Sequence, residues 1–228
     1  MKSMSIAYPT FALLVPAALF IGLRQDRVAP EPREPVQSVA SVPALERELR
    51  LVVAERGNEV RYRVREQLAR IEFPSDAVGA TNAVTGEIVI GDDGTVVRDR
   101  SKFTVDLTGL ESDSDRRDGY IQRRTLETET YPTVEFVPTA ITGLATPPQS
   151  SGEFALTVRG DMTIRGTTRA VQWDVTASAA GGAYTGTAKT AFTFEDFGMT
   201  KPRVASVLSV VDTIRLEYDF RLIPSRGQ

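Results

Sequence analysis

The chain of 228 residues contains neither cysteine nor histidine. Without cysteine it has no disulfide framework, no thiolate nucleophile, no cysteine-based metal site and no lipoprotein-type anchor. Without histidine it lacks the usual general base, the serine–histidine–aspartate arrangement and most zinc sites. A net charge of only -3 gives no electrostatic case for binding nucleic acid. These absences exclude thiol- and histidine-based catalysis, and although carboxylate pairs could still do acid–base work, nothing in the sequence positions such a set.

Motifs of catalysis and cofactor binding are also missing. The sequence has no Gly-x-Ser-x-Gly and no glycine-rich phosphate loop. The acidic stretch ESDSD at 111–115 has alternating carboxylates, but Arg116 stands where a calcium loop needs glycine. We therefore expect a protein that is not an enzyme, with no metal and no cofactor.

The N-terminus has the pattern of a targeting segment. Residues 6–23 are uncharged and lie between Lys2 and Arg24. They are longer than a usual signal core and slightly short for a membrane-spanning helix, so a cleaved signal peptide and an uncleaved signal anchor both fit residues 1–28. Either one predicts an exported, periplasmic or extracellular protein, anchored to the membrane through residues 6–23 if the segment is retained.

A second composition change marks the start of the folded domain. Residues 29–43, APEPREPVQSVASVP, are rich in proline and polar residues, which is typical of an extended linker. From Ala44 the pattern changes to alternation of apolar and polar residues. We therefore predict one domain over residues 44–228.

That domain is predicted to be all-β. The clearest alternation lies in EFALTVRGDMTI at 153–164 and again at 213–222. One apolar face per strand favours antiparallel pairing. Similar runs lie near 49–54, 59–66, 81–90, 95–107, 132–142, 168–178 and 183–195. About eight or nine long strands fit a sandwich or an up-and-down barrel, and their length favours a barrel of about eight strands, wide enough to fill itself or hold one small ligand.

Three glycines, Gly86, Gly160 and Gly186, fall in register with the inward face of their strands. The first interpretation is a bend or bulge of the barrel wall. The second is that the missing side chains leave room for a guest.

A helical insert interrupts the strands at 116–127. Asp113 or Asp115 is predicted to cap it, and Pro132 requires it to end by Tyr131. Its apolar side needs a surface to pack on, so we expect a lid over one end of the barrel.

Three stretches together resemble the YceI-like, polyisoprenoid-binding family. They are RRDGYIQRRTLETETYPTVEF at 116–136, GDMTIRGTTRAVQWDV at 160–175 and FTFEDFGM at 192–199, and the resemblance covers about residues 48–223. It implies a lipocalin-like up-and-down antiparallel barrel, exported, with an apolar tunnel that holds an isoprenoid chain. The chain departs from the family pattern at Tyr120, where the family often has histidine.

The residues expected to line the interior share an inward register and an apolar side chain; they are Phe103, Val134, Phe136, Phe154, Met162, Trp173, Phe192 and Phe194. Taken alone, an inward aromatic residue is usually plain core, but as a set these residues line whatever interior exists. The N–H of Trp173, the single tryptophan, needs a partner if buried, which favours a place near a polar mouth.

The lid and mouth residues are Arg117, Asp118, Tyr120 and Leu126. Arg117 and Asp118 are expected to pair with each other or cap the helix, and a contact between Arg117 and a ligand headgroup is the alternative.

Three functions remain open at this stage. The first is carriage of a long isoprenoid or quinone-type lipid. The second is an envelope interaction module with a filled barrel and no lipid. The third, an enzyme acting on a hydrophobic substrate inside the barrel, has the least support. Native lipid, cleavage of the signal and oligomeric state are not fixed by the sequence.

Overall fold

The computed structural model describes residues 48–69, 72–204 and 207–225. Within them, the segments of alternating apolar and polar residues form β-strands. The expected signal or anchor (1–28), the linker (29–43) and the domain boundary at Ala44 lie outside these residues and stay predictions. Among the residues described, no helix is long and apolar enough to cross a membrane.

The strands of the described chain are β1 (Leu49–Val53), β2 (Glu59–Leu68), β3 (Ser75–Thr81), β4 (Val84–Ile90), β5 (Lys102–Asp106), β6 (Glu111–Ser112), β7 (Thr133–Thr142), β8 (Gly152–Ile164), β9 (Thr167–Ala180), β10 (Ala183–Thr193) and β11 (Val207–Pro224). The helical elements are a 3₁₀ turn η1 (Arg98–Arg100), the helix α1 (Asp115–Tyr120), a π-helical turn η2 (Ile121–Leu126) and a 3₁₀ turn η3 (Glu195–Phe197).

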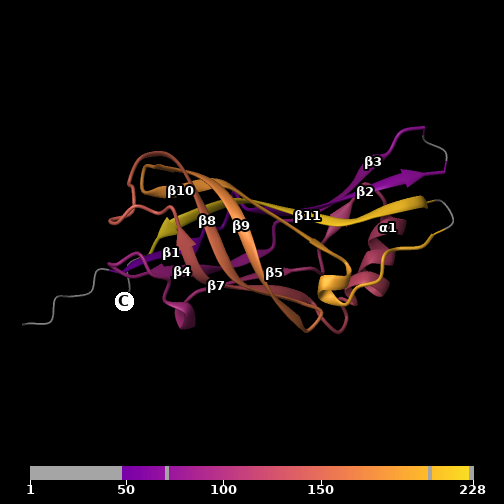
Figure 1. Cartoon of the computed structure of the whole chain (residues 1–228), viewed down its shortest axis with the longest axis horizontal. Coiled ribbons are helices and arrows are strands. Elements are labelled where there is room, and N and C mark those ends of the chain that lie inside the picture. The colour runs from indigo at the N-terminus through magenta and orange to yellow at the C-terminus, as the bar shows by residue number, and fades with distance from the viewer. Residues whose placement is uncertain (1–47, 70–71, 205–206, 226–228) are drawn as a thin grey trace, which may run out of the picture. The chain divides into compact units, whose positions relative to one another are not determined.

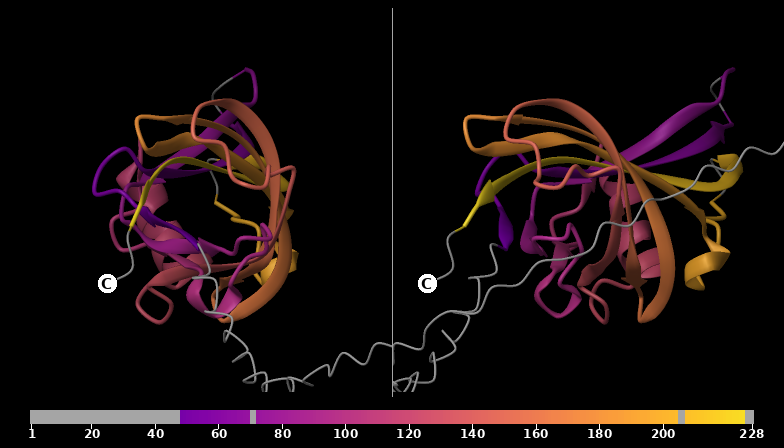
Figure 2. Two further views of the ribbon diagram at one scale, coloured as in Figure 1. Left: turned by 90° about the vertical axis from the view of Figure 1, so that its left-hand side faces the viewer. Right: turned by 60° about the vertical axis from the view of Figure 1, so that its left-hand side comes forward.

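Eight of these strands close into an antiparallel barrel, as expected. They pair in the order β1-β4-β5-β7-β8-β9-β10-β11, and β11 returns to β1 through the pair Val52 and Ile223. Viewed along the barrel, the strands form a continuous ring (Figure 2). Closure leaves no sheet edge between these strands, so their backbone groups are paired inside the wall.

One end of the barrel is extended by the remaining strands. The 18-residue β11 pairs with β10 from Thr213 to Leu222 and, on its other side, with β2 from Val207 to Asp219. β2 also pairs with β3, and β3 pairs with β6. Figure 1 shows β2, β3 and the start of β11 at the same end as α1, on the right. We call the end of the barrel that holds β2, β3, the start of β11 and α1 the lid end.

Two predicted strands differ in the structure. The run at 81–90 forms its strand, β4, only from Val84, because Thr81 ends the strand β3, which was not predicted, and its Oγ1 accepts from Ala83 N in the turn between them. The run at 95–107 begins its strand only at Lys102, because η1 precedes it and Ser101 Oγ donates to Val97 O. Short polar side chains that bond to nearby backbone compete with extended pairing in this way.

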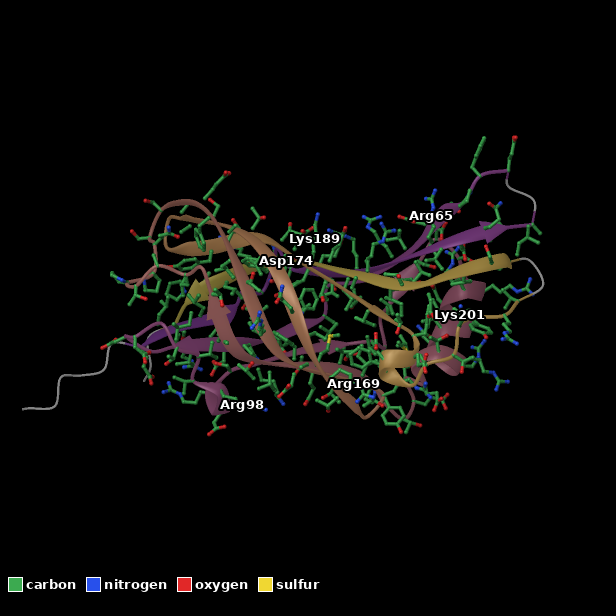
Figure 3. The ribbon with its side chains drawn as sticks, in the orientation of Figure 1. Arg65, Arg98, Arg169, Asp174, Lys189 and Lys201 are labelled. Carbon is green, nitrogen blue, oxygen red and sulfur yellow. The ribbon has the colours of Figure 1, made fainter. Side chains whose placement is uncertain are left out.

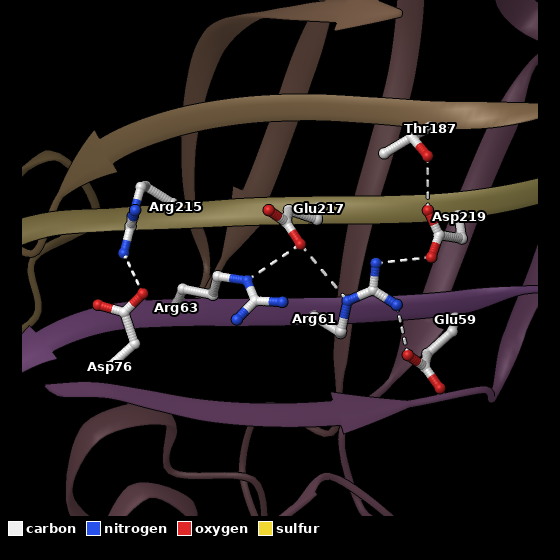
Figure 4. Close-up of polar contacts among 8 residues, drawn as sticks. All are labelled: Glu59, Arg61, Arg63, Asp76, Thr187, Arg215, Glu217 and Asp219. Carbon is white, nitrogen blue, oxygen red and sulfur yellow. Dashed lines mark hydrogen bonds and ion pairs between the residues drawn. The ribbon is translucent and has the colours of Figure 1, made fainter. Parts of the chain in front are cut away.

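The outer face of β2 and β11 carries a ladder of ion pairs (Figure 4). Arg61 contacts Asp219 at 2.6 Å and Glu59 at 2.5 Å, while Arg63 contacts Glu217 at 3.0 Å. The hydrogen bond from Arg63, helped by Arg61, holds the pKa of Glu217 below its ordinary value despite burial. Pairs this exposed contribute little individually, but they match charges across neighbouring strands and so favour one register.

Candidate functional site

The inward faces of the barrel enclose a cavity of about 1080 Å³. Apolar side chains from nearly every strand line it, and within the described residues the only charged side chains on its wall are Glu66, Arg116 and Arg117. The alternation that produced the strands also produces this division, because every second residue of β8, and of β11 from Ile214 on, faces inward. Charged residues such as Arg65, Asp174 and Lys189 lie on the outside (Figure 3).

All eight residues expected on the inner face border this cavity: Phe103, Val134, Phe136, Phe154, Met162, Trp173, Phe192 and Phe194. Phe136 lies in a lateral row, opposite Phe103 on β5 and Met162 on β8. Its ring meets the Trp173 ring edge to face, with centroids 6.0 Å apart. Their position on the wall is a structural result, and their role as a ligand site stays a prediction.

The expected polar partner of Trp173 is not seen. Trp173 is buried on β9 opposite Val158, and its Nε1 has no hydrogen-bond partner among the residues described. The reason is the position of the residue in the middle of β9, where the buried residues of its cluster are apolar.

The inward glycines do not enlarge the cavity. A Cβ on Gly86 would lie 2.1 Å from Lys102 O, and one on Gly186 would lie 2.1 Å from Thr176 O. A Cβ on Gly160 would meet the ring of Phe136 at 2.6 Å. Neighbouring backbone and aromatic rings already occupy the space, so the three glycines permit close approach of neighbouring groups and do not leave room for a guest. A register shift, the expected bulge, lies only opposite Gly160, between Pro138 and Ala140.

The insert between β6 and β7 covers one end of the cavity. α1 and η2 together, residues 115–126, form what we call the lid; Tyr120, Ile121, Thr125 and Leu126 border the cavity. The predicted cap was wrong by one residue: Ser114 Oγ accepts from Arg117 N, whereas Asp113 pairs with the Arg117 side chain. The lid ends where Glu127 adopts a left-handed conformation with φ of 53°, before the limit set by Pro132.

Arg117 and Asp118 were expected to pair with each other or to cap the helix; neither side chain caps it, since Ser114 does, and the two do not pair because each has a better-placed partner. Asp118 accepts from the backbone N of Ser112 at 3.0 Å and from its hydroxyl at 2.5 Å, and it does not border the cavity. Arg117 donates to Glu66 at 3.0 Å and pairs with Asp113. Burial works against the charge of Arg117, but these carboxylates outweigh it and raise its pKa.

Glu66 and Tyr62 of β2 are site residues that the sequence analysis missed. Glu66 is 8% exposed and lies on the cavity wall. Tyr62 lies on the same wall, and its burial raises the pKa of its hydroxyl to about 12. The signal was present, since Val60, Tyr62, Val64, Glu66 and Leu68 share one phase of a period-two strand. A carboxylate in an inward phase predicts a buried ion pair or a functional group.

Comparison with known proteins places this geometry among related folds. The family described as YceI-like domain matches residues 53–222. No curated protein matches the chain.

Three solved structures are similar. A polyisoprenoid binding domain from Saccharophagus degradans is 12% identical, with a TM-score of 0.59, over 77% of this chain and 98% of that one. BcnA from Burkholderia cenocepacia is 17% identical, with a TM-score of 0.53, over 72% and 95%. The YceI protein of Campylobacter jejuni is 13% identical, with a TM-score of 0.51, over 71% and 91%. At these identities the likeness shows the fold.

Proposed function

The chain belongs to the YceI-like domain family, and from that premise we propose that it binds and carries a long apolar lipid of the isoprenoid or quinone type inside its barrel, outside the cytoplasm. The single observation that carries the proposal is the apolar cavity of about 1080 Å³. Ligand pockets usually measure about 300–1,000 Å³, so this one lies at the upper end. A filled barrel, which the alternative of an interaction module requires, would have no such space.

The wall favours a ligand whose affinity comes from its tail. An apolar chain of roughly 40 atoms at about 0.3 kcal/mol per atom gives about 12 kcal/mol, which corresponds to nanomolar binding. All three charged residues of the wall, Glu66, Arg116 and Arg117, belong to the lid end. We propose that a polar headgroup lies at that end and the tail at the other.

Within this polar end the charges differ in availability. Arg117 is engaged by Glu66 and Asp113, which supports a structural role for it and argues against the direct headgroup contact. Arg116 is exposed and has no ion pair among the residues described. We propose Arg116 as the headgroup contact.

The same cavity supports binding over catalysis. Acid–base chemistry needs convergent titratable groups positioned on the substrate. The one buried carboxylate of the wall, Glu66, is held in an ion pair with Arg117. The export part of the proposal rests on the uncharged segment at residues 6–23.

Fluorescence of the single tryptophan tests the proposal. Trp173 borders the cavity, and quinones quench indole emission on contact. We expect saturable quenching by a long-chain quinone and much weaker quenching by the same headgroup without its tail. The variant Trp173→Phe, which has no tryptophan, supplies the blank. Equal quenching by tailed and tailless quinone would contradict carriage in the cavity and favour the interaction module.

A further inference from the structure

Exposed apolar side chains gather at one end of the barrel. Four large hydrophobic residues of the described chain are strongly exposed: Phe73 (72%), Leu208 (67%), Val211 (48%) and Ile223 (38%). The first three belong to the loop between β2 and β3 and to the start of β11, at the lid end, whereas Ile223 lies at the opposite end beside β1. We call Phe73, Leu208 and Val211 the rim residues.

Register shifts in β11 leave Leu208 without a partner residue on β2 and turn Val211 outward. Val207 pairs with Leu68 and Ser209 pairs with Gln67, so Leu208 is an extra residue in β11. A second register shift lies between Val210 and Ile214 and contains Val211. Regular alternation from Val207 would point residue 211 inward, but the two shifts make Val207, Val210 and Ile214 the cavity-lining residues instead. Bulges of this kind re-aim side chains at barrel rims.

The rim is continuous with the cavity. Leu68, Ala69, Val207 and Val210 border the cavity, and they lie in the same two segments as the rim residues. An apolar surface therefore runs from the inner wall over the lip to the outside. A ligand that enters from water needs no such path, whereas a ligand that leaves a lipid layer does.

We propose that the lid end docks on a lipid bilayer, with Phe73, Leu208 and Val211 inserted among the headgroups and the cavity opening toward the lipid. The apolar faces of amphipathic helices at a membrane surface lie about 5–10 Å deep in the headgroup boundary, and we expect the rim residues to insert in the same way. Arg116 on the cavity wall and the exposed Arg203 supply cations at the lid end for anionic headgroups, whereas the exposed Lys201 already pairs with Asp212 at 3.8 Å. Figure 3 shows Lys201 at the lid end.

The sequence outside the structure is long enough for this orientation. The segment from Arg24 to Arg47 has 24 residues with both ends counted, and it spans at most about 80 Å when extended. β11, the longest strand, has 18 residues and spans about 60 Å. The described chain enters the barrel at β1, whose Leu51 pairs with Pro224 at the end opposite the lid end. The preceding segment is nevertheless long enough for a chain held in a bilayer by residues 6–23 to place the lid end on the same bilayer.

A site-specific probe separates rim docking from tethering by the N-terminus. Because the chain has no cysteine, Leu208→Cys and Phe73→Cys each provide a single site for the environment-sensitive dye NBD in the full chain. The matched control is Ile223→Cys, an exposed apolar site at the other end. Vesicles of equal parts phosphatidylcholine and phosphatidylglycerol should raise and blue-shift the emission at positions 208 and 73 and leave that at 223 unchanged.

Several outcomes would overturn the proposal. No change at 208, or an equal change at 223, removes the rim as the docking surface. A change at 208 that depends on protein concentration without vesicles assigns the rim to a second copy of the chain. The result does not depend on whether the cavity carries lipid, so it fails independently of the proposed function.

A second variant links docking to transfer. Leu208→Ser with Val211→Ser alters the rim and leaves the cavity wall intact. We expect transfer of a long-chain quinone from vesicles to slow by about tenfold, with unchanged binding of the same quinone from detergent solution. Unchanged transfer would contradict a role of the rim in lipid entry.

Discussion

A bulky side chain placed in the middle of the cavity should block it without breaking the barrel. Ala188 on β10 borders the cavity, opposite Val175 on β9 and Tyr218 on β11. In Ala188→Trp the indole enters existing space, so overpacking should cost at most about 1–3 kcal/mol of stability. The barrel should therefore still fold.

The effect on a long ligand should be much larger. A buried tryptophan side chain covers about 200 Å², and a ligand excluded from that area at about 25 cal/mol per Å² loses about 5 kcal/mol. That loss corresponds to a dissociation constant more than about a thousandfold higher. Long-chain quinone binding should be measured by equilibrium partitioning, together with the thermal midpoint.

The neighbouring residue offers a matched control. Lys189 follows Ala188 on the same strand and points outward (Figure 3). Lys189→Trp adds the same ring outside the barrel and should leave binding unchanged. If Ala188→Trp folds and binds a long-chain quinone as tightly as wild type, the ligand does not occupy the middle of the cavity.

Three further changes probe the wall, the lid and the outer face. Phe136→Asp places a carboxylate in the apolar wall and should lower stability by about 3–5 kcal/mol and abolish lipid retention, while Phe136→Leu should retain both; a stable, lipid-loaded aspartate variant would refute the placement of this ring. Arg117→Met leaves Glu66 buried without its cation and should cost about 3 kcal/mol in denaturant unfolding, whereas the double change with Glu66→Gln should recover most of it; no recovery would show that the pair does not act together. The pKa of Glu217 is lower in the folded chain than in the unfolded one, so its ion pair stabilises the fold above about pH 4.5 and is lost as pH falls through the folded pKa. The difference in thermal midpoint between wild type and Glu217→Gln should therefore shrink below pH 4, and a constant difference would contradict this assignment.

Most of the fold could be predicted from the alternation of apolar and polar residues. A strand with one apolar face leaves a strong period-two signal, and the run at 153–164 gave both β8 and the inward side of Phe154 and Met162. Closure into a barrel followed from strand length. The helical insert was visible because Pro132 and the charged residues before it interrupt that period.

The pattern could not predict where a side chain bonds to nearby backbone and ends a strand, or which residues distant in the sequence pair with each other. The break between β3 and β4 depends on a hydroxyl of Thr81 that bonds to nearby backbone instead of the ladder. The partners of Arg117 are Glu66, 51 residues away in the sequence, and Asp113. The sequence alone favoured its neighbour Asp118. The outward turn of Leu208 and Val211 results from register shifts against β2, which a single strand does not reveal.

Mass spectrometry of an organic extract from the purified full chain tests the central claim most directly. The account predicts a long apolar lipid, isoprenoid or quinone in type, in near-equimolar amount from wild type and Lys189→Trp, and little from Ala188→Trp. An extract with no lipid from wild type, together with no uptake of added polyprenol or quinone, would contradict carriage and leave the barrel as an interaction module.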